Sequence, residues 1–89
     1  IKGYRNSVRK VDACEYVLCG TAELDEVSRF LEIDLHDEEH ATISGYLMGA
    51  LNHIPKVGDK VLEQGYEFIV QKVLKHRVAE VIVRKIKKD

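Results

Sequence analysis

The sequence predicts an α+β domain in which two helices pack on one face of a small antiparallel β-sheet, in the order β-α-α-β-β-β. Residues 22–32 and 43–52 carry apolar side chains at the spacing of amphipathic helices. Shorter segments rich in β-branched and aromatic residues precede and follow them. The last three of these segments are joined by short turns, which antiparallel neighbours allow. The length of 89 residues is that of one domain.

The first strand is expected over residues 15–20, a β-favouring run that Gly20 ends. Residues 1–7 are basic and polar, and we interpret them as a linker or tail. Val8 and Val11 leave open a further short strand before the predicted one.

The first helix is expected over residues 22–32, with Thr21 as its N-cap. Glu23, Asp25 and Glu26 follow in the first turn, where the helix dipole favours negative charge.

The second helix is expected over residues 43–52, with Thr42 as its N-cap. Gly45 and Gly49 lie four residues apart on it, and their missing side chains predict that another element approaches the helix closely. The apolar stretch of about ten residues is too short to span a membrane.

The other three strands are expected over residues 60–63, 66–75 and 78–87. Val81 and Val83 share one face of the last strand, whereas Val78 has the opposite parity. This change of parity predicts a bulge, or a late start of the strand, near residue 79. A turn is expected at His76 and Arg77.

The net charge of −1 hides two segments of opposite sign. Residues 23–39 carry eight carboxylates against Arg29 alone, a net charge of −7, and residues 71–89 carry +5. Either the two segments lie near each other in the fold, with Arg77 paired to the acidic one, or the charges steer a partner or cation. The near-neutral total argues against a nucleic-acid-binding domain.

Cys14 and Cys19 are too few and too far apart for a disulfide framework. Five residues of strand separate their Cα atoms by roughly 16 Å, well beyond the ~7 Å limit for a bridge. We therefore expect free thiols in a reducing compartment, buried as small apolar residues. The chain has no Ser/His/Asp signature and no Gly-rich phosphate loop, so we predict that it is not an enzyme.

A candidate metal site is the run His36-Asp37-Glu38-Glu39-His40. Carboxylate oxygens suit hard divalent cations, and imidazole suits zinc or cobalt. His36, Asp37, Glu39 and His40 are the candidate ligands, in a weak site that water completes. The alternative is a solvated acidic loop before a helix N-terminus.

A candidate cofactor site is the start of the second helix, where Thr42, Ser44 and Gly45 would offer N–H groups to a phosphate. The carboxylates just upstream oppose an anion there, and no dinucleotide-binding glycine motif is present.

The sequence resembles the CorC/HlyC transporter-associated domain over residues 8–87, with residues 88–89 as a tail. A Thr-x-x-Gly helix start is followed about ten residues later by an Ile-Pro-x-x-Gly-Asp turn, as in that family. The stretches that carry the resemblance are residues 16–20, 42–47, 54–59, 68–70, 77–78 and 81–83.

The resemblance implies a C-terminal domain of a membrane protein that also carries a pair of CBS modules. Such proteins are assigned to magnesium and cobalt efflux or called hemolysin-like, and the domain lies on the cytoplasmic side of the membrane. The implied fold is similar to part of the FAD-binding PCMH-like fold, from which FAD binding is often inferred. The first residue is Ile rather than Met, which fits a piece of a longer chain.

Two functions are therefore expected from different classes. The first is a non-catalytic regulatory domain that modulates ion transport through contacts with the CBS pair and the membrane domain, or with a second copy in a homodimer. The second is a sensor that binds a divalent cation, FAD or an adenine nucleotide. Neither nucleic acid nor direct membrane insertion is expected.

Overall fold

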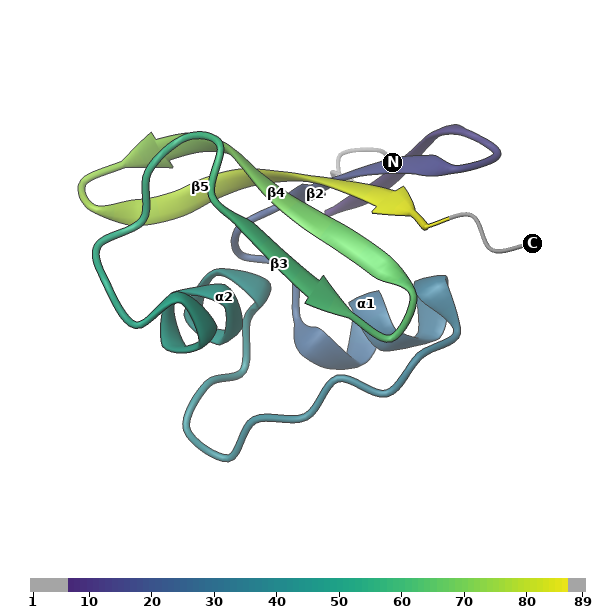
Figure 1. Ribbon diagram of the computed structural model, residues 1–89. Coiled ribbons are helices and arrows are strands. Elements are labelled where there is room, and N and C mark those ends of the chain that lie inside the picture. The colour runs from purple at the N-terminus through teal and green to yellow at the C-terminus, as the bar shows by residue number, and fades with distance from the viewer. Residues whose placement is uncertain (1–6, 87–89) are drawn as a thin grey trace, which may run out of the picture.

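The computed structural model describes residues 7–86, which form one five-stranded antiparallel sheet with two helices on one face (Figure 1). The strand order across the sheet is β1-β2-β5-β4-β3. The elements are β1 (Val8–Asp12), β2 (Glu15–Cys19), α1 (Leu24–Leu31), α2 (Ile43–Leu51), β3 (Lys60–Glu63), β4 (Tyr66–Leu74) and β5 (Arg77–Lys85). The predicted α+β class is confirmed, and the segment left open at Val8 is a strand. The linker expected over residues 1–7 lies outside the described residues except for Ser7, and the tail at 88–89 lies entirely outside them.

The bulge predicted near residue 79 is present where β4 pairs with β5. Val70 faces Val81 and Val73 faces Val78, but the register shifts between these two pairs and leaves Ala79 without a partner in β4. The shift returns Val78 to the buried face of the sheet, where it is 3% exposed. The main chain therefore bends at Ala79 so that valines of both parities reach the core.

Gly20 is required at this bulge because β5 lies directly against it. The N–H of Gly20 donates to the carbonyl of Ala79 over 2.9 Å. A Cβ on Gly20 would collide with the backbone carbonyl of Val78. The glycine that ends β2 thus allows the close approach of two main chains.

The start of α1 differs from the sequence prediction. The N-cap is Glu23 rather than Thr21, and its side chain makes no capping hydrogen bond. Instead, Glu23 forms an isolated antiparallel bridge with Thr42, and the N–H of Leu24 donates to the carbonyl of Ala41 over 2.8 Å. A strand-like contact between the two helix starts therefore provides an acceptor for the N–H of Leu24, in place of a side-chain cap.

The core lies between the helices and the sheet. Its fully buried members come from both layers: Leu18, Val27, Ile43, Leu47, Phe68, Val70, Val81 and Val83. The hydroxyl of Tyr66 donates to the carbonyl of Leu31 over 3.2 Å, which ties the end of α1 to the sheet. No helix in residues 7–86 is long and apolar enough to cross a membrane.

The predicted burial of the two cysteines is wrong, because Cys14 and Cys19 are both exposed. Leu18 faces the core, and alternation along β2 therefore turns Cys19 to the opposite face of the sheet. Cys14 lies in the turn between β1 and β2, where its N–H donates to Oδ1 of Asp12 over 2.8 Å.

Direct pairing between the acidic and basic segments is not observed. Within residues 7–86, none of the ion pairs joins residues 23–39 to residues 71–86. Arg77 is exposed at the β4–β5 turn and takes part in none of these pairs, and Arg84 approaches Glu15 over 3.8 Å. The charge separation seen in the sequence therefore persists on the surface.

Candidate functional site

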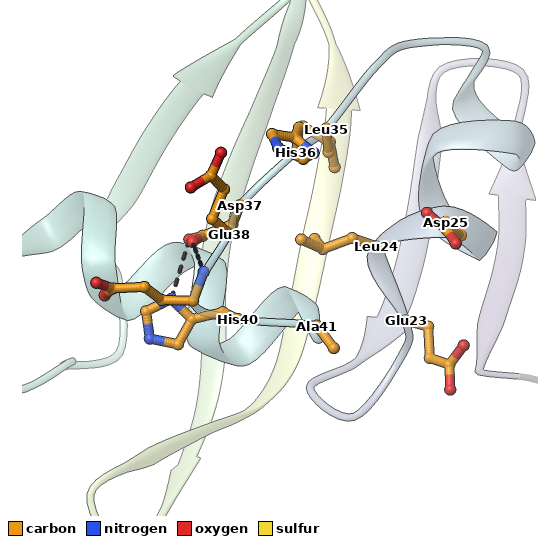
Figure 2. Close-up of a pocket in the computed structure, with 10 residues that line it drawn as sticks. Glu23, Leu24, Asp25, Leu35, His36, Asp37, Glu38, His40 and Ala41 are labelled. Atoms are coloured by element: carbon orange, nitrogen blue, oxygen red, sulfur yellow. Dashed lines mark hydrogen bonds and ion pairs between the residues drawn. The ribbon is translucent and has the colours of Figure 1, made fainter.

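A shallow pocket of about 350 Å³ lies between the start of α1 and the loop that leads to α2 (Figure 2). Its lining combines five carboxylates and two imidazoles with three apolar side chains, and includes no lysine or arginine. The lining residues are Glu23, Leu24, Asp25, Leu35, His36, Asp37, Glu38, Glu39, His40 and Ala41. The pocket therefore favours a cation over an anion.

The loop that forms this pocket is held in place from two sides. Leu35 is buried, and its N–H donates to the hydroxyl of Ser28 on α1 over 2.9 Å. Gln64 lies in the turn between β3 and β4. Its side-chain Oε1 accepts from the N–H of Asp34 over 3.0 Å, and its Nε2 donates to the carbonyl of Asp34 over 2.7 Å. These contacts fix the main chain on which the acidic side chains are carried.

Asp37 and His40 form the main polar contact of the pocket. Nδ1 of His40 lies 2.9 Å from Oδ2 of Asp37, and Oδ1 of Asp37 accepts from the N–H of Glu39 over 2.8 Å. The hydrogen bond to His40, followed by that to the N–H of Glu39, lowers the pKa of Asp37. The side chains are 22% and 37% exposed for Asp37 and His40, so the pair is open to water.

The ring of His40 packs against the glycines of α2. A Cβ on Gly45 would lie 2.8 Å from Cβ and Cδ2 of His40, and one on Gly49 would lie 3.5 Å from its Cε1. The glycines therefore admit a close neighbour, as expected, but that neighbour is a side chain of the preceding loop and not another helix or strand. The packing orients Nδ1 of the imidazole toward Asp37 (Figure 2).

Of the four predicted metal ligands, the structure pairs Asp37 with His40. The ring of His36 lies toward the other end of the loop segment (Figure 2). Within residues 7–86, no three His, Cys, Asp or Glu side chains converge closely enough to hold an ion. The arrangement therefore offers at most a two-residue contact, with both oxygens of Asp37 already accepting hydrogen bonds.

The predicted phosphate site at the start of α2 is not supported, because its donors are used within the chain. The N–H of Ser44 donates to the carbonyl of Gly20 over 2.9 Å, and that of Gly45 to the Oγ1 of Thr42 over 3.3 Å. The first N–H of the helix donates to the carbonyl of Ala22 over 2.8 Å. The predicted N-cap role of Thr42 is confirmed. In that role its side chain takes the N–H of Gly45, which would otherwise have been free to bind an anion.

Tyr46, on α2, is a titratable residue that the sequence did not single out. Burial, followed by the negative charge of Glu63, raises the pKa of Tyr46 to about 12. Glu63 lies at the end of β3, so the pair depends on the packing of α2 against that strand.

A second pocket, of about 400 Å³, was also missed from the sequence. Its lining is aromatic with two lysines: Lys10, Tyr16, Phe30, Leu31, Glu32, Tyr66 and Lys85. The rings of Tyr16 and Phe30 meet edge to face, with their centroids 5.5 Å apart. Strand register places Lys10 beside Tyr16 and Lys85 beside Tyr66, and no local pattern in the sequence indicates this assembly.

Comparison with known proteins identifies relatives over nearly the whole chain. The model of the CorC_HlyC transporter-associated domain matches residues 9–87. UPF0053 protein YhdP of Bacillus subtilis is 32% identical over 84 residues, which cover 94% of this chain and 19% of that protein. The magnesium and cobalt efflux protein CorC of Buchnera aphidicola is 31% identical over 86% of this chain and 26% of its own length. The chain thus spans about a fifth to a quarter of these relatives.

Solved structures show the same fold. A CorC_HlyC domain from Nitrosomonas europaea superposes with a TM-score of 0.84 at 26% identity, over 92% of this chain and 99% of that one. A CorC-associated region from Neisseria meningitidis gives a TM-score of 0.85 at 23% identity, over 91% of this chain and all of that one. A Xylella fastidiosa domain solved in complex with Mg++ and Mn++ gives 0.79 at 16% identity, over 92% of this chain and all of that one. With the matched family model and relatives above 30% identity, the chain belongs to the CorC_HlyC transporter-associated domain family.

Proposed function

We propose that the chain is a non-catalytic regulatory domain of a CorC/HlyC-type membrane protein. It modulates ion transport from the cytoplasmic side through contacts with the CBS pair and the membrane domain. The observation that carries the proposal is the match of nearly the whole chain to a small part of much longer relatives. One of those relatives is named as a magnesium and cobalt efflux protein, and a further relative, from Haemophilus influenzae, is named as a polyamine export protein.

The geometry is consistent with a domain that acts through its surface. The acidic pocket is shallow, and its central pair, Asp37 and His40, makes hydrogen bonds within its own loop. The sheet ends on one side at β1 and on the other at β3, and an exposed edge strand is a surface for pairing with another chain or a second copy.

The test is to delete residues 8–87 from the full-length protein and to measure efflux of Mg²⁺ and Co²⁺ from cells. We expect the shortened protein to reach the membrane but to transport at a changed rate or with a changed response to cation concentration. The full-length Glu26→Gln variant, altered at an exposed position on α1, is the control and should transport as the wild type does. An unchanged transport profile after the deletion would contradict a regulatory role.

A second candidate function is that of a divalent-cation sensor. The acidic pocket brings five carboxylates and two imidazoles to one loop and the neighbouring helix start. A domain of the same fold from Xylella fastidiosa was solved in complex with Mg++ and Mn++. A cation in this pocket would hold water for most of its ligands, as Mg²⁺ commonly does in proteins.

Titration of the domain with MgCl₂, MnCl₂ and CoCl₂, followed by calorimetry and thermal unfolding, tests the sensor. We expect the cation to raise the unfolding midpoint, and the double variant Asp37→Asn, Glu39→Gln to lose this response. The matched control Glu26→Gln, Glu32→Gln removes the same amount of charge outside the pocket and should keep the response to the cation. No heat and no shift with any cation would exclude the cation sensor and leave the regulatory role standing. FAD and ATP belong in the same series, because flavin or adenine-nucleotide binding is the other form of the sensor hypothesis.

A further inference from the structure

We propose that the end of the domain formed by the β4–β5 turn and the loop before β3 binds the surface of a bilayer that contains anionic phospholipids. We call this surface the basic end. It is defined by four cations, Lys56, Lys72, Lys75 and Arg77, and three apolar residues, Ile54, Val57 and Leu74. This contact is peripheral, and it goes beyond the proposed regulatory role without depending on it.

Two segments distant in the sequence build the basic end. The N–H of Gly58 donates to the carbonyl of Val70 over 2.8 Å, and the N–H of Val70 donates to the carbonyl of Asp59 over 2.8 Å. These bonds hold the loop before β3 against the middle of β4. The loop and the β4–β5 turn lie at the same end of the molecule (Figure 1). Lys56 lies on this loop and the other three cations lie on the hairpin, and all four cationic side chains are exposed.

The same surface carries apolar side chains that the core does not use. Val57, Ile54 and Leu74 are 67%, 63% and 59% exposed, and they are three of the four most exposed large hydrophobic residues in the described part of the chain. Val73 and Val78 take the inward positions next to the turn, so Leu74 projects to the other face opposite Arg77. Apolar side chains among lysines and arginines match the interface of an anionic membrane. There the apolar groups leave water and the cations are attracted to the lipid headgroups.

Few negative charges oppose this surface. Glu80 pairs with Lys72 in the strand register. Asp59 accepts from the N–H of Lys56 over 2.9 Å and lies 3.9 Å from Nδ1 of His53. Five of the eight carboxylates of the acidic segment lie in the connection between α1 and α2, and the other three lie at the start of α1. The connection runs beyond the helices on the side away from the sheet (Figure 1). The field of the molecule would therefore turn the basic end, rather than the acidic loop, toward a negative surface.

A membrane fits the basic end better than an acidic protein segment does. Both pockets described above lie elsewhere, one at each end of α1, so neither provides a groove for a peptide at this surface. Exposed apolar residues on turns can enter the headgroup region without a matching cavity. The charge separation found in the sequence thus acquires a physical role as an orienting dipole.

Cosedimentation with lipid vesicles tests the proposal directly. The 89-residue chain is mixed with vesicles of phosphatidylcholine alone, or of phosphatidylcholine with phosphatidylglycerol, at low and high salt. Solved relatives that match over their full length show that such a domain folds as a separate chain. We expect binding only to the vesicles with phosphatidylglycerol, and weaker binding at high salt.

Three variants separate the basic end from general charge. One replaces its four cations with glutamine: Lys56, Lys72, Lys75 and Arg77. A matched control replaces four exposed cations elsewhere: Arg9, Lys10, Arg29 and Lys85. The third variant is Val57→Ser with Leu74→Ser. All the changes are at exposed positions, and circular dichroism checks that each variant is folded.

We expect the basic-end variant to bind at least about tenfold more weakly, and the control to lose much less. The serine variant should bind more weakly than the wild type and become more sensitive to salt. Equal loss in the two charge variants would overturn the proposal, because general attraction would then explain the binding. No binding of the wild type to anionic vesicles would also overturn it and would favour an acidic protein partner for this surface.

Discussion

His40 shows how one side chain is placed by residues outside its own loop. The ring lies on Gly45 and Gly49 of α2, where any larger residue would meet it, and the position of the ring brings Nδ1 to Asp37. Two glycines in one helix reduce helix propensity, so this packing offsets a local cost. Gly45 is the closer neighbour and Gly49 only touches the edge of the ring.

The two glycines should therefore respond in opposite directions to the same substitution. Gly45→Ala places a methyl group 2.8 Å from Cβ of His40, and we expect it to lower the free energy of unfolding by about 1–3 kcal/mol. Gly49→Ala makes ordinary contact at 3.5 Å, and we expect it to raise that free energy by up to about 1 kcal/mol through helix propensity. Urea denaturation measures both. The same sign for the two variants would mean that His40 does not pack as described.

At the scale of elements, the junction where β2, β5 and the two helix starts meet fixes how the helices are placed on the sheet. Gly20 donates its N–H to Ala79 of the β5 bulge and offers its carbonyl to Ser44 at the start of α2. The Glu23–Thr42 bridge then links the starts of the two helices. One short segment therefore sets the position of both helices relative to the centre of the sheet.

Gly20→Ala should destabilise the fold at this junction more than other glycine substitutions do. The added methyl group would overlap the backbone carbonyl of Val78, which cannot move without breaking the sheet. We expect the free energy of unfolding to fall by at least about 2 kcal/mol. Thermal and urea unfolding would measure the loss, with Gly49→Ala as the control. A stability equal to that of the wild type would contradict the close approach of β5 to Gly20.

Residues 7–86 have one core that both helices and the central strands share. We expect the domain to unfold in a single transition, because removing either helix would expose the same buried residues. Far-ultraviolet circular dichroism reports mainly the helices, and tyrosine fluorescence reports all four tyrosines, among them Tyr16 and Tyr66 of the sheet. Coincident midpoints are the expected result, and a separate early transition in one signal would contradict the shared core.

Charge is also arranged at the scale of the whole molecule. The acidic residues gather at the start of α1 and in the connection between α1 and α2, whereas the described basic segment is divided. Lys72, Lys75 and Arg77 lie at the β4–β5 turn, while Arg84 and Lys85 lie near the opposite end of β5. The loop before β3 adds Lys56 to the first group. The proposed basic end is thus a product of the tertiary arrangement.

Local patterns in the sequence predict much of the fold for clear physical reasons. The periodicity of apolar residues locates both helices, and the parity change between Val78 and Val81 locates the bulge. Thr42 is correctly predicted as an N-cap because its hydroxyl acts within four residues of chain. Thr21 is wrongly predicted because the start of α1 is set by pairing with the distant Thr42 rather than by a local side chain.

In the candidate sites too, some features follow from local sequence patterns and others only from tertiary contacts. The run from His36 to His40 is evident as a set of donors, but only the packing on α2 decides that His40 meets Asp37. The N–H groups at the start of α2 look free in the sequence, yet Gly20, Ala22 and the Thr42 side chain accept them. Cys19 looks like a buried apolar residue until the direction of β2 exposes it.

The sequence by itself determined the α+β class, the positions of the two helices, the bulge and the family, because these follow from periodicity and short motifs. Tertiary structure alone decided which residues meet: His40 with Gly45, Glu23 with Thr42, and the loop before β3 with β4. The physical reason is that strand pairing and core packing bring together groups whose separation along the chain carries no local signal. The two helices on one face of an antiparallel sheet, predicted at the outset, are therefore also the frame that separates the acidic loop from the basic end.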